Sequence, residues 1–249
     1  MGVLDMENKK AILKQEDIME LLNKLYGCSV SGIPKVSPPI SKLADDYISK
    51  SKDIESAAKS FINYQIVKCT TSGFITGLGG LITLPIAIPA NISSVLYVQM
   101  RMIACLAQMG GFDIKSDQVQ TLVYACLAGI SIDQVVKQVG IKFGVKVANQ
   151  MVKKIPGTVL TKINQKVGFR FLTKFGTKGL INFGKAIPVV GGVISGGFDF
   201  AETKIIANRA YRMFILGDFS SPVEKGEDAL DSSDDEVEIV EGDTPRIEN

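Results

Sequence analysis

Few side chains in this 249-residue chain could do acid-base or metal chemistry, because it contains no histidine. The usual general base at neutral pH, the Ser-His and Cys-His nucleophile pairs and the commonest metal ligand are therefore missing. The remaining candidates are Asp199 and Glu202, one helical turn apart, with Arg101 and Arg209 as charged neighbours in apolar segments. Such a carboxylate pair could act as acid and base or hold a divalent ion.

A structural role is the alternative for these charges. A charge in an apolar segment must be paired, because an unpaired buried charge is costly. We expect Arg101 to form a buried ion pair with Asp199 or Glu202, clamping two apolar hairpins together. No third oxygen ligand lies nearby in the sequence, so we predict no metal, no cofactor and no catalytic residue. A hydrolase-like enzyme that uses Asp199 and Glu202 stays as the alternative.

A stripe of basic residues recurs at every fourth position within residues 158–183. Its members are Lys162, Lys166, Arg170, Lys174 and Lys178. Each step of four advances about 40° around a helix, so the stripe covers about 160°. We expect Phe169, Phe171, Leu172 and Phe175 to fill the opposite side. The pattern predicts a cationic amphipathic helix that binds anionic lipid, with an ordinary core-packing helix and a solvated lysine face as the alternative.

Charge is distributed unevenly along the chain. From Asp218 onward there are twelve acidic residues against two basic ones, whereas residues 134–198 hold eleven basic residues and no acidic one. The acidic segment has too few apolar residues to offset its ordering entropy, so we predict a disordered tail. It either screens the basic face or only solubilises the chain. No binding-module motif is visible and tryptophan is absent, so we predict no nucleic-acid partner.

The elements that must position these residues are predicted to be helices. Apolar spacing predicts a helix over residues 5–26 that stops at Gly27, and one or two more over 41–68. Ser116 is typical of an N-cap for a helix over 117–129, and Ser131 with Gln134 of a capping box for one over 132–150. Because period-2 alternation and hairpin turns are missing, we predict an all-α fold.

Residues 69–100 form an uncharged run interrupted by two prolines. The prolines leave segments shorter than the roughly 20 residues of a spanning helix. A buried helix pair is the preferred interpretation, and a re-entrant or interfacial hairpin and a transmembrane span are the alternatives. Residues 186–200 form a second glycine-rich run, in which the proline precedes the glycines, whereas in the first run the glycines precede the prolines.

The glycines and prolines of the two runs are predicted to permit close helix packing between them. They are Gly73, Gly77, Gly79, Gly80, Pro85, Pro89, Pro188, Gly191, Gly192, Gly196 and Gly197. The spacing of a phosphate-binding loop is absent, no strand precedes the glycines and no lysine closes the loop, which argues against a nucleotide site.

These runs carry a family resemblance. The stretches GFITGLGGLITLPIAIPAN, VLYVQMRMIACLAQMGGFD and KAIPVVGGVISGGFDFAETKIIANRAYRMF are similar to the EcsC protein family. The likeness covers roughly residues 40–216 and does not include the acidic tail. It implies a helical fold without an established enzymatic activity, in a mostly bacterial family named after a gene beside an ABC-transporter operon.

We therefore expect a single multi-helix domain over 41–217, preceded by an N-terminal helix and Pro-rich loop over 1–40 and followed by the acidic tail over 218–249. The four cysteines have no C-x-x-C pair and no secretory segment is visible, which predicts reduced thiols and a cytoplasmic protein. We predict a non-enzymatic protein, peripherally associated with an anionic membrane surface. Support of a membrane transporter or trafficking complex, and a membrane-inserting or pore-forming role, stay open.

Overall fold

The computed structural model describes residues 14–70, 90–133, 149–175 and 193–219. Regular structure within these ranges is helical, apart from an isolated bridge between Ile33 and Ser37, so the predicted all-α class is confirmed. The helices are α1 (Gln15–Ser31), α2 (Ile40–Ser49), α3 (Ile54–Thr70), α5 (Ala90–Met109), α6 (Asp117–Ala128), α8 (Asn149–Val152), α9 (Gly157–Phe175) and α11 (Val193–Phe214).

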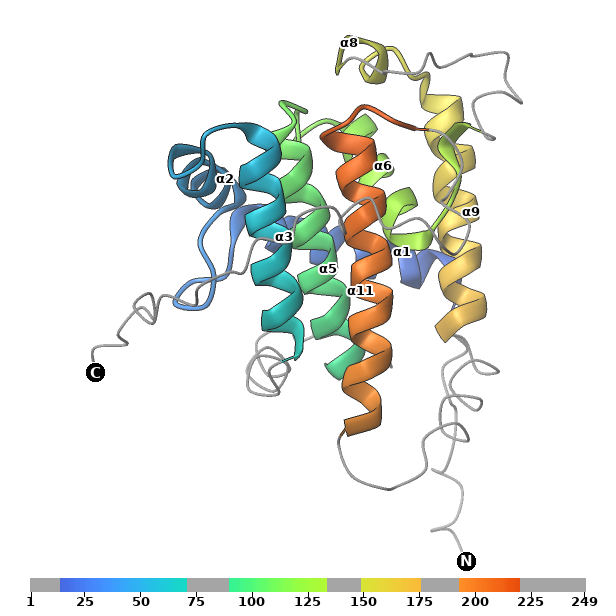
Figure 1. Ribbon diagram of the computed structural model, residues 1–249. Coiled ribbons are helices and arrows are strands. Elements are labelled where there is room, and N and C mark those ends of the chain that lie inside the picture. The colour runs from blue at the N-terminus through green and yellow to red at the C-terminus, as the bar shows by residue number, and fades with distance from the viewer. Residues whose placement is uncertain (1–13, 71–89, 134–148, 176–192, 220–249) are drawn as a thin grey trace, which may run out of the picture.

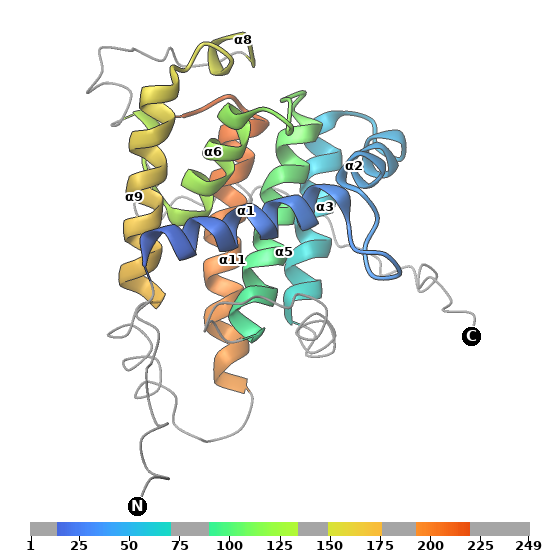
Figure 2. The same cartoon turned by 180° about the vertical axis from the view of Figure 1, so that it is seen from behind.

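The helices pack around α5. It contacts α1, α2, α3, α6 and α11, while α9 packs on α6 and α1 (Figure 1). Seen from behind, α1 runs crosswise over the bundle from α9 to α2 and passes over α5 (Figure 2). One continuous core results, and α1 contributes Ile18, Leu21, Leu22 and Leu25 to it. The predicted N-terminal helix is thus part of the same core as the following helices.

The helix α5 is buried on all sides. From Leu96 to Ala107 its side chains are buried without interruption, including the polar Gln99 and Arg101. A helix that is apolar all round belongs in the centre of a protein or in a membrane. Here the neighbouring helices cover it. The first part of the apolar run, residues 71–89, lies outside the described residues, and so does the expected helix pair. In the described part of the chain, no helix is long and apolar enough to cross a membrane.

The end of α1 differs from the prediction. The helix continues through Gly27 to Ser31 and ends at Gly32, whose φ is 77°. Gly27 is exposed and costs the helix only about 1 kcal/mol relative to alanine. Ser29 lies fully buried in the last turn, and its hydroxyl donates to the carbonyl of Tyr97. Tertiary contacts of the last turn therefore decide where α1 ends.

The other predicted helix ends are mostly confirmed. The segment 41–68 forms two helices, α2 and α3. Ser116 caps α6 by accepting a hydrogen bond from the Val119 amide at 3.3 Å, and Gly129 ends α6 in the left-handed region. A helix begins directly after Ser131, at residue 132, and its continuation past 133 lies outside the described residues.

The folded body extends slightly beyond the predicted boundary at residue 217. Phe219 is 3% exposed and belongs to the core, and Asp218 forms an ion pair with Arg212 of α11. These two residues close the C-terminal end of α11 and are not part of a free tail. The rest of the predicted tail, residues 220–249, lies outside the described residues.

Candidate functional site

The helix α9 carries the predicted basic stripe, and the residues of its buried face also recur at every fourth position. Val159, Ile163, Val167 and Phe171 are buried against α6 and α1. Gly168 lets α1 approach closely, since a Cβ at that position would lie 2.5 Å from the side chain of Gln15. The amide of Gln15 donates to the carbonyl of Gln165 at 3.0 Å. The apolar stripe and the α1 contact thus fix which face of α9 is exposed.

The exposed face of α9 begins with Lys162, Lys166 and Arg170. Within the part of the chain that the structure describes, these three side chains have no ion-pair partner. Phe169 lies on this exposed face with 63% of its surface accessible, so its predicted position opposite the basic residues is wrong. Phe169 follows Lys166 by three positions, which is a rotation of about 300° around the helix axis. The two side chains therefore point in directions only about 60° apart and share one face of the helix.

The fourth cation of the stripe, Lys174, turns inward. Its ammonium forms an ion pair with Glu202 of α11, and both side chains are only partly exposed. The drift of about 40° per four residues explains the change, because it carries the stripe from the exposed face toward the neighbouring helix. The first three members of the stripe are therefore exposed to solvent, whereas Lys174 contacts α11.

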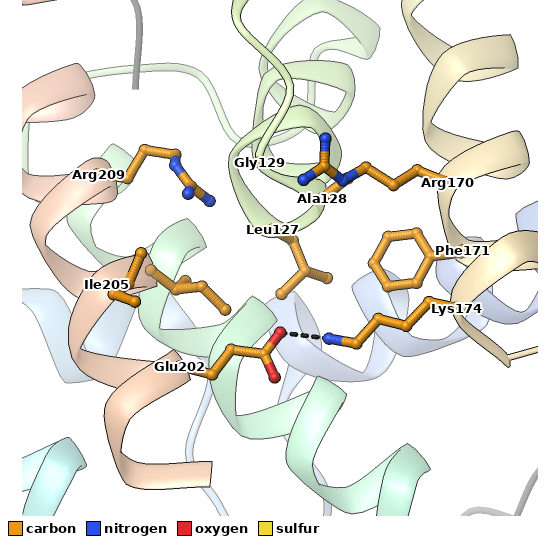
Figure 3. A pocket seen from close by; sticks show the side chains of 10 residues that line it. Leu127, Ala128, Gly129, Arg170, Phe171, Lys174, Glu202, Ile205 and Arg209 are labelled. Atoms are coloured by element: carbon orange, nitrogen blue, oxygen red, sulfur yellow. Dashed lines mark hydrogen bonds and ion pairs between the residues drawn. The ribbon is translucent and has the colours of Figure 1, made fainter. Parts of the chain in front are cut away.

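A pocket of about 310 Å³ opens where α6, α9 and α11 meet. Within the described part of the chain, its lining residues are Leu127, Ala128, Gly129, Arg170, Phe171, Lys174, Glu202, Ile205, Ile206 and Arg209. Figure 3 shows Arg170 and Arg209 extending from opposite sides toward Gly129, with the Lys174–Glu202 pair below them. Ile205 is 55% exposed. The pocket thus combines three cations, one carboxylate and an apolar wall.

Arg209 is held in place by the end of α6. Its Nη1 donates to the carbonyl of Cys126 at 2.7 Å, one of the last carbonyls of that helix. A cation at this end is also favoured by the helix dipole. A Cβ at Gly129 would lie 3.2 Å from the Arg209 guanidinium, so the small residue leaves space for the arginine. Burial raises the pKa of the Cys126 thiol to about 12, so this cysteine stays protonated.

The predicted ion pair between Arg101 and Glu202 is wrong. Arg101 is buried, but its guanidinium donates to the carbonyl of Ser29 at 2.8 Å and to that of Pro38. Glu202 pairs with Lys174 instead. The two charges belong to different sides of the bundle, since Arg101 reaches the end of α1 whereas Glu202 faces α9. The side chain of Asp199 lies outside the described residues, and with it the expected Arg101–Asp199 ion pair and the carboxylate pair of Asp199 and Glu202.

Several other predicted site residues also lie outside the described residues: Lys178, Gly73, Gly77, Gly79, Gly80, Pro85, Pro89, Pro188, Gly191 and Gly192. Gly196 and Gly197 fall in the first turns of α11. A close backbone approach does occur elsewhere, at Gly110 after α5. A Cβ there would lie 2.0 Å from the carbonyl oxygen of Phe214, at the end of α11.

Two features of the pocket were missed by the sequence analysis. Glu202, Ile205, Ile206 and Arg209 stand at positions i, i+3, i+4 and i+7, which places them on one face of a helix. That spacing is a signal that could have grouped Arg209 with Glu202. The contribution of Leu127–Gly129 from α6 had no such signal, because it depends on how α6 packs. Among the described residues, no cluster of three cysteine, aspartate or glutamate side chains could hold a metal ion.

Comparison with known proteins gives one match. The EcsC protein family matches residues 9–216, which is most of the chain. The chain belongs to the EcsC protein family. The matched range starts before α1 and ends after α11, so it includes α1. Neither the curated proteins nor the solved structures include a match.

Proposed function

We propose that this EcsC protein is a cytoplasmic, non-enzymatic protein that binds an anionic membrane surface peripherally through the exposed face of α9. The observation that carries the proposal is Phe169, whose ring is 63% exposed beside Lys162, Lys166 and Arg170. An aromatic ring among cations suits the boundary between lipid headgroups and acyl chains. Each basic residue near an anionic surface adds about 1 kcal/mol of attraction.

The surroundings of α9 support the same proposal. No acidic residue occurs between residues 134 and 198, and α8 together with the turn before α9 adds exposed Met151, Lys153 and Lys154. The nearest acidic side chains along α1 are Glu16 and Asp17, next to the Gln15 contact with α9. An anionic surface that approached α9 would therefore meet more positive than negative charge.

Co-sedimentation with vesicles tests the proposal. The full chain is expected to bind vesicles that contain phosphatidylserine and to bind phosphatidylcholine vesicles much less. Added salt should weaken the binding because the attraction between the charges is screened. A Lys162→Gln/Lys166→Gln double variant should bind about tenfold less, since it loses two contributions of about 1 kcal/mol that are partly screened. Phe169→Ser should weaken binding without removing its salt dependence.

The matched control removes two lysines elsewhere. Lys42 belongs to α2 and Lys52 to the connection between α2 and α3, and both are exposed. The helix α2 lies on the opposite side of the bundle from α9 (Figure 1). A Lys42→Gln/Lys52→Gln variant has the same net charge as the α9 variant and should bind as the unchanged protein does. Equal losses in the two variants would show that binding depends on net charge alone, and the proposal for α9 would then be wrong.

A further inference from the structure

The pocket between α6, α9 and α11 offers a second, more specific site. Two of its cations, Arg170 and Arg209, come from different helices and extend toward the same point near Gly129 (Figure 3). Guanidinium groups bind phosphate through pairs of parallel hydrogen bonds. Arg209 uses one nitrogen for the Cys126 carbonyl, which leaves donors of its planar fork for a ligand.

The charge of the pocket limits what can bind. Arg170, Lys174 and Arg209 provide three positive charges and Glu202 one negative charge, so the described part of the lining carries a net charge of +2. The Lys174–Glu202 pair neutralises one wall and leaves the two arginines in excess. A phosphomonoester carries between one and two negative charges at neutral pH, which matches this excess.

The rest of the lining is apolar. Leu127 and Phe171 form the wall below Arg170, and Ile205 exposes 55% of its surface at the pocket. An exposed isoleucine beside two arginines suits a ligand with an apolar part that follows its charged group. At about 310 Å³ the pocket lies near the lower limit for small-molecule sites, so it accepts one headgroup and the start of an acyl chain.

We infer that this pocket binds the phosphomonoester headgroup of a single anionic lipid, with the phosphate between Arg170 and Arg209 and the glycerol and first acyl carbons against Leu127, Phe171 and Ile205. The inference rests on the proposed function, because α9 supplies both the membrane-facing surface and one wall of the pocket. It adds selectivity for one headgroup to a surface that alone would bind any anionic membrane.

Calorimetric titration with water-soluble probes tests the pocket without a membrane. The probes are dihexanoyl phosphatidic acid below its micelle concentration, dihexanoyl phosphatidylcholine and inorganic phosphate. The full chain should bind the phosphatidic acid at least tenfold more tightly than either of the others. Equal binding of inorganic phosphate would overturn the lipid assignment, and equal binding of the phosphatidylcholine would overturn the role of the phosphomonoester.

Pocket variants make the test specific. Arg209→Gln removes the guanidinium together with its bond to the Cys126 carbonyl, and it should weaken phosphatidic acid binding at least tenfold. Arg170→Gln is a second variant at an exposed position, so it provides the same test if Arg209→Gln fails to fold. Glu202→Gln removes the only carboxylate that the described residues contribute to the lining, and it should tighten binding about three- to tenfold. Unchanged affinity in all three folded variants would refute the site.

A double dissociation separates this inference from the proposed function. Lys162→Gln/Lys166→Gln should bind vesicles about tenfold less yet bind dihexanoyl phosphatidic acid normally, because neither lysine is among the lining residues. Glu202→Gln should behave in the opposite way, with tighter probe binding and nearly unchanged binding to phosphatidylserine vesicles. Vesicle binding without any probe binding would leave the α9 proposal standing and overturn the pocket inference. Probe binding without vesicle binding would do the reverse.

Discussion

At the scale of single residues, Arg101 shows how a buried charge can be accommodated without a carboxylate among the described side chains. It is 6% exposed, and it donates to the carbonyls of Ser29 and Pro38. Ser29 lies in the last turn of α1, which has no basic residue of its own. Arg101 of α5 therefore supplies the cation that this helix end favours. Burial lowers the pKa of Arg101 from its usual value, and the guanidinium stays charged at neutral pH.

Replacement of Arg101 by methionine tests this arrangement. Methionine has a similar length but no donor, so the buried Ser29 carbonyl would lose its partner, while Pro38 is exposed and can bind water. One unsatisfied buried acceptor costs about 1–3 kcal/mol. We expect Arg101→Met to lower the free energy of unfolding by about 2 kcal/mol in urea titration.

The control is Arg101→Lys, whose ammonium can reach one carbonyl and should lose less stability. A methionine variant as stable as the unchanged protein would contradict the assignment. It would mean that the desolvation cost of the guanidinium equals the gain from its hydrogen bonds.

At the scale of the element, α9 combines two stripes with a step of four residues. The apolar stripe of Val159, Ile163, Val167 and Phe171 fixes the helix on α6 and α1. The basic stripe follows the same drift, so its first members face solvent and Lys174 meets Glu202. A step of four residues rotates about 40° further than a full turn of the helix. Successive members of the basic stripe therefore point first to solvent and then to the pocket.

The start of α3 gives a second prediction at this scale. The carboxylate of Asp53 accepts a hydrogen bond from the Ser56 amide at 2.7 Å, as an N-cap does. This bond, together with Lys52 and Lys59, lowers the pKa of Asp53 below its usual 3.8. A lowered pKa in the folded state means that the stabilisation is complete above about pH 4 and is lost as the pH falls through the folded value.

The test compares the unchanged protein with Asp53→Asn, because asparagine caps helices about as well and does not titrate. Urea unfolding should give similar stability for the two proteins at pH 7. Below pH 4 the unchanged protein should lose more stability than the asparagine variant. A difference between them that stays constant from pH 7 to pH 3 would show that the Asp53 carboxylate does not contribute in this way.

At the scale of the whole molecule, the charges separate into a cationic body and an acidic C-terminal segment. Residues 220–249 contain eleven acidic and two basic residues. In contrast, residues 134–198 of the body include eleven basic residues and no acidic one. The burial of Phe219 ties the start of this segment to the core. We predict from composition that this segment is flexible, and thirty such residues would have a root-mean-square reach of about 30 Å, comparable with the radius of a domain of this size.

We predict that the segment competes with lipid for the basic face of α9. A protein that ends at Phe219 should bind phosphatidylserine vesicles more tightly than the full chain at low salt, by about three- to tenfold. The difference should shrink at high salt because the competition is electrostatic. Phosphate on Ser232 or Ser233 would add between one and two negative charges and should strengthen the competition. Identical vesicle affinities would leave the segment a solubilising role only.

The sequence by itself determined the fold class, the family and most helix positions. Local signals were enough for these: the Ser116 cap and the four-residue periods on α9 follow from neighbours in the chain. The sequence also predicted that Lys162, Lys166 and Arg170 share one face, because helical geometry alone places residues four positions apart side by side.

Only the tertiary structure decided which residues meet. It extended α1 past Gly27 to Ser31, where Ser29 is buried, and it directed Arg101 to the carbonyls of Ser29 and Pro38. It also paired Glu202 with Lys174 and not with Arg101. It also exposed Phe169, because α6 and α1 pack on the other sides of α9. These outcomes depend on how helices far apart in the sequence cross, and periodicity within one helix carries no information about its partner.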